Sequence, residues 1–243
     1  MKIFPVVHIN ENDVFGAVRE SKRAFNSGAD GIYLIDRNNG AGDVKPLFNT
    51  YYSIVAESPE RYVGLNILDL SPYDAMRLLA RSLNKSKGLI PAPAALWVND
   101  MRSDAVENPL HKNLAMELKN SNPRLETVRI IGGVAYKNTD FFTDDPDLAR
   151  YEASWLESAV DVVLTSAATT HREPSFDKLK AMKEVIDKPL AVDGGISINN
   201  IRQYSGVVDE ALVSRAIETS PGSGKIDQRE LEKLIELAHS LAE

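Results

Sequence analysis

The 243-residue sequence contains no cysteine and only four histidines. The absence of cysteine excludes disulfides and thiolate metal sites, so a metal would need His, Asp or Glu ligands. The four histidines, His8, His111, His171 and His239, are far apart in the sequence and form no ligand motif. We therefore expect neither a metal centre nor a cofactor.

The sequence also lacks a basic run and a long apolar run, and its net charge is −7. This balance argues against a groove that binds nucleic acid through bulk charge. The apolar stretch in "MKIFPVVHIN" is interrupted by Pro5 and is too short for a signal peptide core or a membrane span. We expect a cytoplasmic protein without membrane insertion, and a homo-oligomer is possible.

What the sequence does contain is a repeated alternation of short apolar runs with amphipathic stretches of helical period. The runs are nearly continuous in apolar residues, as in parallel strands that are covered on both faces. They lie at 3–9, 31–35, 62–68, 95–98, 127–136, 161–166, 189–194 and 210–214. Eight strand–helix units in one chain of this length predict a single (β/α)8 TIM barrel over residues 1–243, with its termini close together.

An open, doubly wound sheet is the alternative architecture for alternating strands and helices. Such a sheet usually carries a glycine-rich turn after its first strand. The turn after "VVHI" reads "NENDVF" and contains no glycine. The sequence therefore favours the closed barrel.

The boundaries of several helices are marked by capping residues. Asp13 and Gly28 bracket the first helical stretch, as an N-cap and a C′ glycine. The pairs Ser71–Pro72 and Asp145–Pro146 each place a cap before a first-turn proline. Asp227 and Glu230 have the spacing of a capping box.

A phosphate site is indicated by the segments "PLAVDGGISINNI" and "VSRAI", which follow the seventh and eighth runs. In many barrels these two loops bind phosphate through backbone N–H groups and a helix N-terminus. We expect Gly194, Gly195, Ser214 and Arg215 to donate these N–H groups, with a helix that begins near Ser197. The alternative is a tight turn that merely needs glycine.

Candidate catalytic residues also follow the predicted strands, because active sites of barrels lie at that end. Asp36 and Asp193 are candidates for an acid pair that moves a proton, and Asp100 lies within reach of the same region. Lys137 is a candidate for stabilising an enolate or forming a Schiff base. The alternatives are a helix cap for Asp193 and a structural ion pair for Lys137.

Further polar residues at strand ends are candidates for substrate binding. They are His8, Asn66, Asn99, Thr165 and Ser166. A buried core histidine is the alternative for His8. His171, in "TTHREP", lies in a stretch that could close over a substrate.

Several segments together resemble the BtpA family of barrel proteins, which is named for photosystem biogenesis. They occur in the family's order and cover most of the chain. They are "GADGIYLIDRNNGAGDVKPLF", "YVGLNILDLSPYDAMRLLA", "ALWVND", "GGVAYKN", "LTSAATTHREPSFDKLKAMKEV" and "PLAVDGGISINNI". The resemblance implies a phosphate-binding TIM barrel, without a reaction that can be carried over.

The sequence departs from that family at three turns. "HINEND" lacks a Pro- and Gly-rich turn, "VDGG" replaces a Gly-Ser-Gly turn, and "SRAI" replaces a Gly-Thr pair. The last two resemble ribulose-phosphate-binding barrels, whose pentose-phosphate epimerases have acids at positions that match Asp36 and Asp193. The histidine metal cluster of those epimerases is missing here beyond His8.

Three functions fit these observations. The first is an enzyme that acts on a small phosphorylated sugar or phosphoribosyl compound by isomerase-, epimerase- or aldolase-type chemistry. The second is a non-catalytic binding or assembly protein of the BtpA type. The third is a nucleoside- or nucleobase-processing barrel in which Asn66 and Asn99 contact a base edge.

Overall fold

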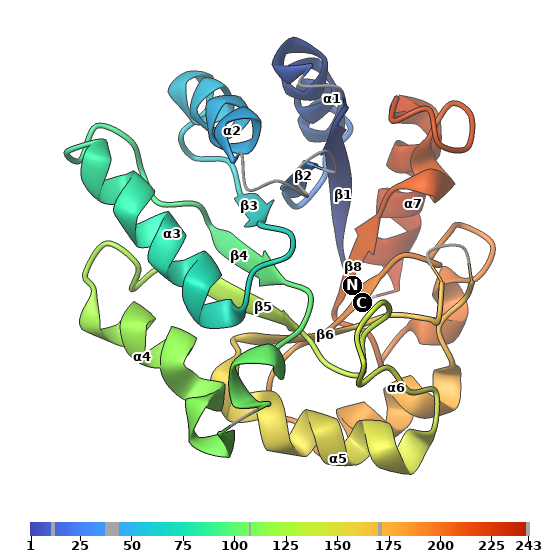
Figure 1. The fold of residues 1–243 in the computed structure, drawn as a ribbon. Coiled ribbons are helices and arrows are strands. Elements are labelled where there is room, and N and C mark those ends of the chain that lie inside the picture. The colour runs from blue at the N-terminus through green and yellow to red at the C-terminus, as the bar shows by residue number, and fades with distance from the viewer. Residues whose placement is uncertain (11–12, 37–43, 107, 170–171, 242–243) are drawn as a thin grey trace.

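In the computed structural model, eight parallel strands form a closed barrel in chain order, β1 through β8 (Figure 1). The structure describes residues 1–10, 13–36, 44–106, 108–169 and 172–241. The predicted TIM barrel is therefore confirmed. The strands are β1 (Lys2–Ile9), β2 (Ile32–Asp36), β3 (Val63–Asn66), β4 (Ala95–Val98), β5 (Arg129–Gly133), β6 (Val162–Thr165), β7 (Leu190–Asp193) and β8 (Glu210–Val213).

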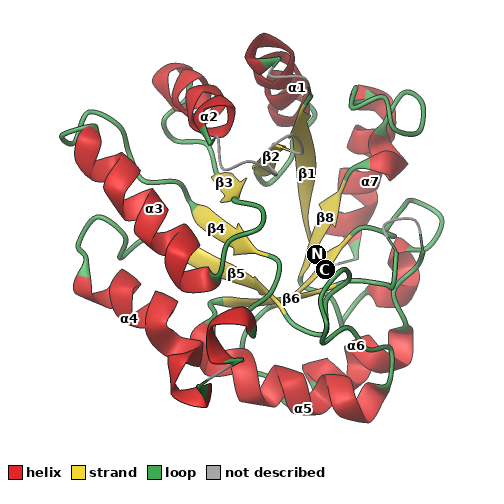
Figure 2. Cartoon of the chain, viewed as in Figure 1, coloured by secondary structure: helices red, strands yellow, loops and turns green. Residues whose placement is uncertain are grey.

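Seven α-helices surround the strands (Figure 2). They are α1 (Val14–Asn26), α2 (Lys45–Glu57), α3 (Pro72–Lys85), α4 (Leu114–Ser121), α5 (Pro146–Leu156), α6 (Phe176–Lys183) and α7 (Gln228–Ser240). Five short 3₁₀ helices lie between them: η1 (Ser103–Ala105), η2 (Pro109–Asn113), η3 (Glu157–Ala159), η4 (Ile201–Tyr204) and η5 (Arg215–Ile217). The chain begins beside the last helix, with the N-terminal amine 3.5 Å from the Ala238 carbonyl oxygen of α7 (Figure 1).

The predicted N-caps form at four helices, but the capping box of Asp227 and Glu230 is incomplete, because the Asp227 N–H donates to the Ile217 carbonyl oxygen at 2.8 Å. Asp13 accepts the Gly16 N–H, Ser71 accepts the Asp74 N–H, Asp145 accepts those of Asp147 and Leu148, and Asp227 accepts those of Arg229 and Glu230. These bonds satisfy N–H groups that the first turn of a helix leaves unpaired.

The expected helix near Ser197 does not form. The segment after β7 contains only η4, and the Ser197 N–H donates to Asn200 Oδ1 at 2.8 Å. The segment after β8 likewise begins with the single turn η5. Neither loop therefore offers the N-terminus of an α-helix, and that part of the predicted phosphate site is wrong.

Side chains alternate between two hydrophobic layers along each strand. On β2, Tyr33 and Ile35 belong to the cluster inside the barrel, whereas Ile32 and Leu34 belong to the cluster between strands and helices. This alternation decides which strand-end side chains face the mouth of the barrel.

The amino-terminal end of the barrel is filled by a polar network. Arg129 donates to Glu210 Oε1 at 2.8 Å and to the Tyr62 hydroxyl at 3.2 Å. The Tyr62 hydroxyl lies 3.1 Å from that of Tyr33. The network occupies the end opposite to the predicted site, so its role is structural.

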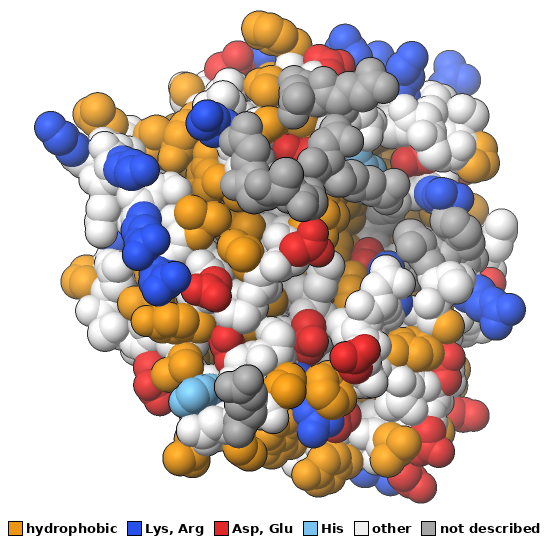
Figure 3. Space-filling model, in the orientation of Figure 1, with side chains coloured by type: hydrophobic (Ala, Val, Ile, Leu, Met, Phe, Trp, Pro, Cys, Tyr) orange, Lys and Arg blue, Asp and Glu red, His pale blue; other side chains and the backbone are white. Residues whose placement is uncertain are grey.

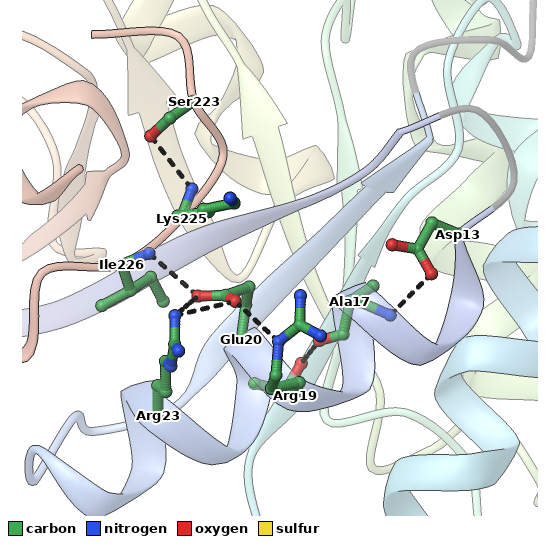
Figure 4. Close-up of polar contacts among 10 residues, drawn as sticks. Asp13, Ala17, Arg19, Glu20, Arg23, Ser223, Lys225 and Ile226 are labelled. Carbon is green, nitrogen blue, oxygen red and sulfur yellow. Dashed lines mark hydrogen bonds and ion pairs between the residues drawn. The ribbon is translucent and has the colours of Figure 1, made fainter. Parts of the chain in front are cut away.

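The loop that follows β8 is attached to α1 by the buried carboxylate of Glu20 (Figure 4). Glu20 accepts the Ile226 N–H at 2.9 Å and forms ion pairs with Arg19 and Arg23 at 3.3 and 3.1 Å. This contact joins residues 206 positions apart and fixes the glycine-containing segment 222–225 beside α1.

The charged side chains are unevenly distributed over the face shown in Figure 3. Lys and Arg lie over α3 and around α1 and α7, and Asp and Glu are frequent near α5 and α6. In the described part of the chain, no helix has the length and apolarity needed to cross a membrane.

Candidate functional site

A cavity of about 300 Å³ opens at the carboxyl ends of the strands. The alternation along the strands directs His8, Asn99, Asp193 and Ser214 toward it, because each continues the inward-facing set of its strand. The cavity is lined by Val6, His8, Ile35, Leu68, Trp97, Asn99, Tyr136, Lys137, Asn138, Asp193, Ser214 and Arg215. We call it the central cavity.

The carboxylate of Asp193 is the centre of the polar contacts in this cavity. Lys137 Nζ lies 2.6 Å from Asp193 Oδ2, and the Tyr136 hydroxyl donates to the same oxygen. The other oxygen, Oδ1, accepts no hydrogen bond from the described residues. All three side chains are nearly buried, with 8% of Lys137 and 11% of Asp193 exposed. As far as the described residues go, the site therefore presents one unpaired carboxylate oxygen beside Lys137 Nζ.

Burial, and then the negative charge of Asp193, raise the pKa of Tyr136 well above its usual value. Tyr136 is therefore a neutral donor that orients the carboxylate. Lys137 Nζ is paired with Asp193 Oδ2 at the wall of the cavity, where it can donate a hydrogen bond to a developing oxyanion. This geometry fits the enolate-stabilising role among the two predicted for Lys137.

The loop that carries Tyr136 and Lys137 has an unusual backbone. Ala135 and Asn138, one on each side of that pair, have φ values of 48° and 60°. Such left-handed conformations are strained for residues other than glycine and persist only where surrounding contacts hold them. One such contact is the Lys137 N–H, which donates to Ser166 Oγ at 2.9 Å.

A second contact comes from Lys178, whose side chain is fully buried at the start of α6. Its Nζ donates to the carbonyl oxygens of Ala135 and Ser166 at 2.8 and 3.0 Å. Thr165 Oγ1 also donates to the Ala135 carbonyl, at 3.3 Å. The loops after β5 and β6 are thus joined behind the central cavity.

A second cavity of about 380 Å³ lies between the loops after β7 and β8. Gly194 and Gly195 both line it, with φ values of 81° and 76°. The Gly194 N–H already donates to the Leu212 carbonyl at 2.9 Å, so it is not available to a ligand. Among bonds between described residues, none uses the N–H of Gly195 or Ser214. We call this the β7–β8 cavity.

The β7–β8 cavity lies next to the central cavity. Ser214 and Arg215 line both. Its charged lining consists of Arg215 on one side and Glu173 on another. The four residues predicted to bind phosphate, Gly194, Gly195, Ser214 and Arg215, are thus brought together in one cavity.

A third cavity, of about 370 Å³, lies beside the central cavity between the loops after β3, β4 and β5. Asp100 lines this cavity and not the central one. Burial, and then the nearby Asp140, raise the pKa of Asp100, although the Arg102 N–H at 2.9 Å lowers it. We call it the β3–β5 cavity.

Of the predicted acid pair, Asp193 lines the central cavity and Asp36 does not. Asp36 continues the outward-facing set of Ile32 and Leu34, and its neighbour Ile35 lines the central cavity instead. Asp36 is 2% exposed at the end of β2. The structure thus brings Asp193 together with Lys137 and Tyr136 rather than with a second acid.

Three of the predicted substrate-binding residues lie below the cavity surface. Asn66, Thr165 and Ser166 are all buried, and none lines the cavities described above. Asn66 Nδ2 donates to Asn99 Oδ1 at 3.0 Å, so Asn66 orients a residue that does line the cavity. His8 and Asn99 are placed as predicted, whereas His171 lies outside the described residues.

No group of three His, Asp or Glu side chains in the described ranges is arranged to hold a metal ion. The residues that the sequence did not reveal are Tyr136, Trp97 and Lys178. The run 127–136 suggested that Tyr136 belongs to a strand, but β5 ends at Gly133. The pair Gly132–Gly133 was the available signal for that early end.

Comparisons with known proteins support the fold and leave the family open. No protein-family model matches the chain. The uncharacterised protein MJ1115 of Methanocaldococcus jannaschii is 27% identical over 119 residues, which cover 47% of this chain and 43% of that protein. The match therefore spans less than half of either protein.

Solved structures with the same architecture cover nearly the whole chain. Phosphoribosyl anthranilate isomerase from Thermus thermophilus is 12% identical in sequence to this chain. The structural match covers 99% of this chain and 100% of the isomerase chain, with a TM-score of 0.65. The 3-hexulose-6-phosphate synthase from Salmonella typhimurium is 18% identical, and its match covers 98% of this chain and 100% of the synthase chain, with a TM-score of 0.64. Thiamine phosphate pyrophosphorylase from Pyrococcus furiosus is 14% identical, and its match covers 100% of this chain and 97% of the pyrophosphorylase chain, with a TM-score of 0.62. At these identities the likeness establishes the TIM-barrel fold.

Proposed function

We propose that this protein is an enzyme that acts on a small phosphorylated sugar or phosphoribosyl compound by acid–base chemistry. The observation that carries the proposal is the contact of Lys137 and Tyr136 with one oxygen of Asp193, in a cavity that shares Ser214 and Arg215 with the β7–β8 cavity. An anion site and a proton-transfer site would then share one cleft.

The phosphate group of the ligand binds in the β7–β8 cavity in this proposal. The N–H groups of Gly195 and Ser214 and the side chain of Arg215 supply its hydrogen bonds. Gly194 contributes the turn rather than a donor, because its N–H is already paired. The three solved proteins compared above are each named for a phosphorylated compound or a phosphoribosyl group, which supports this assignment.

The reacting carbon then lies over the central cavity. Asp193 Oδ1 removes a proton from the carbon next to a carbonyl group, and the Lys137 ammonium stabilises the enolate oxygen that results. Return of the proton from Asp193 to the neighbouring carbon, on the same face of the enolate, gives an isomer. Tyr136 keeps the carboxylate in place through Oδ2.

Proton abstraction can be detected without knowledge of the natural product. We would incubate ribulose 5-phosphate with the protein in D₂O and follow the loss of carbon-bound hydrogen by NMR. The wild type should catalyse this exchange, and Asp193→Asn should slow it by roughly 10²–10⁴-fold. If ribulose 5-phosphate binds without exchange, a non-catalytic binding protein of the type implied by the BtpA resemblance is supported instead.

Phosphate binding has its own test, with two matched glycine variants. A Cβ at Gly195 would collide with the Arg172 carbonyl, whereas one at Gly206 would meet no atom within 4 Å. Both residues have positive φ, at 76° and 79°, so both substitutions carry similar backbone strain. Ribose 5-phosphate at 100 times its Kd should raise the stability of the wild type and of Gly206→Ala by about 2.7 kcal/mol. Gly195→Ala should lose most of this increase. An equal increase in both variants would contradict the assigned phosphate site.

A further inference from the structure

The wall of the central cavity contains a buried hydrogen-bond donor that the mechanism proposed above does not use. Trp97, on β4, lines this cavity and is 2% exposed. Its Nε1 is shielded from solvent and has no hydrogen-bond partner among the described residues. A buried N–H without a partner destabilises a folded protein, so such groups are rare and call for an explanation.

The polar side chains beside Trp97 do not satisfy this donor. Trp97 packs edge-to-face against Tyr33, with ring centroids 5.9 Å apart, but the Tyr33 hydroxyl is paired with that of Tyr62 at 3.1 Å. Asn66 lies opposite Trp97 in the pairing of β3 with β4, and its Oδ1 is also buried without a partner in the described part of the chain. The two unpaired groups therefore do not bond to each other. A group that enters the central cavity is the remaining partner for the Trp97 N–H.

The order of the strands places Trp97 far from the proposed phosphate site. β4 lies four strands from β8 in either direction around the closed barrel, so it stands on the opposite side from Ser214 and Arg215. A ligand whose phosphate binds in the β7–β8 cavity, and which extends over Asp193, meets Trp97 with the end away from its phosphate. In a pentulose 5-phosphate this end carries the C1 hydroxyl and the C2 carbonyl group.

We propose that Trp97 Nε1 donates a hydrogen bond to an oxygen at this end of the sugar, and so selects sugar phosphates long enough to reach it. This inference rests on the proposed function, because the phosphate assignment sets the direction of the ligand. Binding then supplies the partner that the free protein lacks, which favours the ligands that reach Trp97. Because Nε1 is shielded, the contact needs a side-chain adjustment of the kind that commonly accompanies binding.

The indole N–H can be observed directly, because the chain contains only two tryptophans, Trp97 and Trp155. In ¹H–¹⁵N NMR spectra, Trp155→Phe assigns the two indole signals. Saturation with ribulose 5-phosphate should move the Trp97 signal downfield, as expected for a new hydrogen bond. Trp155 lines none of the cavities described above, so its signal should stay in place.

A truncated ligand separates the contact with Trp97 from phosphate binding. Glycerol 3-phosphate keeps the phosphate and the carbons next to it but lacks the far end of the pentulose. In titration calorimetry, Trp97→Phe should weaken ribulose 5-phosphate about tenfold and glycerol 3-phosphate by less than about twofold. Gly195→Ala should weaken both ligands, and Trp155→Phe should weaken neither.

The outcomes distinguish this inference from the proposed function. If ribulose 5-phosphate binds while the Trp97 signal stays in place, or if Trp97→Phe weakens both ligands equally, the inference is overturned and the proposed function stands. If neither ligand binds to the wild type, both are wrong.

Discussion

Replacement of Lys178 by methionine tests whether a buried cation holds the loops behind the central cavity. The side chain is fully buried and donates to the carbonyl oxygens of Ala135 and Ser166 at 2.8 and 3.0 Å. Asp144 is 3.9 Å away and half exposed, so it compensates the charge only weakly. Methionine has a similar length, and it removes both the charge and the two hydrogen bonds.

The magnitude of the effect follows from the pKa of Lys178. Burial lowers this pKa from 10.5 to about 8. Between these two values the unfolded chain binds more protons than the folded protein, so the free energy of unfolding rises with pH. A lysine with these two pKa values contributes about 2.5 kcal/mol of additional stability between pH 7 and pH 10. A neutral amine still donates to both carbonyl groups, so the loops remain in place.

Urea unfolding at pH 7 and pH 10 measures this contribution as a difference of differences. From pH 7 to pH 10, the free energy of unfolding of the wild type should increase by about 2–3 kcal/mol more than that of Lys178→Met. The other titrating groups are common to both proteins, so their contributions cancel. Lys180→Met, an exposed lysine on the same helix, is the control and should behave as the wild type. Equal pH dependence in Lys178→Met and the wild type would refute the buried cation.

Two further predictions concern stability. Glu210→Ala removes the buried partner of Arg129 at the amino-terminal end of the barrel. It should lower the free energy of unfolding by about 3 kcal/mol in urea titrations. A loss below about 1 kcal/mol would contradict the structural role of this pair. Asp100→Asn should raise Tm at pH 7 but not at pH 3. Because burial raises the pKa of Asp100, its carboxylate destabilises the folded state at neutral pH, and protonation relieves this effect as the pH falls. A lower Tm of the variant at pH 7 would show that Asp100 makes a compensating contact.

The sequence predicted the barrel well because each unit carries its own signals. Eight apolar runs and the caps at Asp13, Ser71, Asp145 and Asp227 are local features, and local features agreed with the global fold. The absent helix after β7 was harder to predict. The stretch between Asp193 and Glu210 must return to the other end of the barrel, and it forms only the short turn η4.

The candidate site was predicted only in part, for a reason that lies in the strands themselves. Strands covered on both faces have nearly continuous apolar sequences, so the sequence does not reveal which residues point inward. Asp36 was therefore predicted to face the site, whereas the structure directs its neighbour Ile35 to the cavity. The contact of Asp193 with Tyr136 depends on where β5 ends, which a run of ten residues left open.

A crystal structure of the protein with ribose 5-phosphate tests the central claim most directly. The account predicts a phosphate group within hydrogen-bond distance of the Gly195 and Ser214 N–H groups, with the sugar extending over Asp193 Oδ1 and Lys137 Nζ. A phosphate bound elsewhere, or a sugar that points away from Asp193, would contradict it.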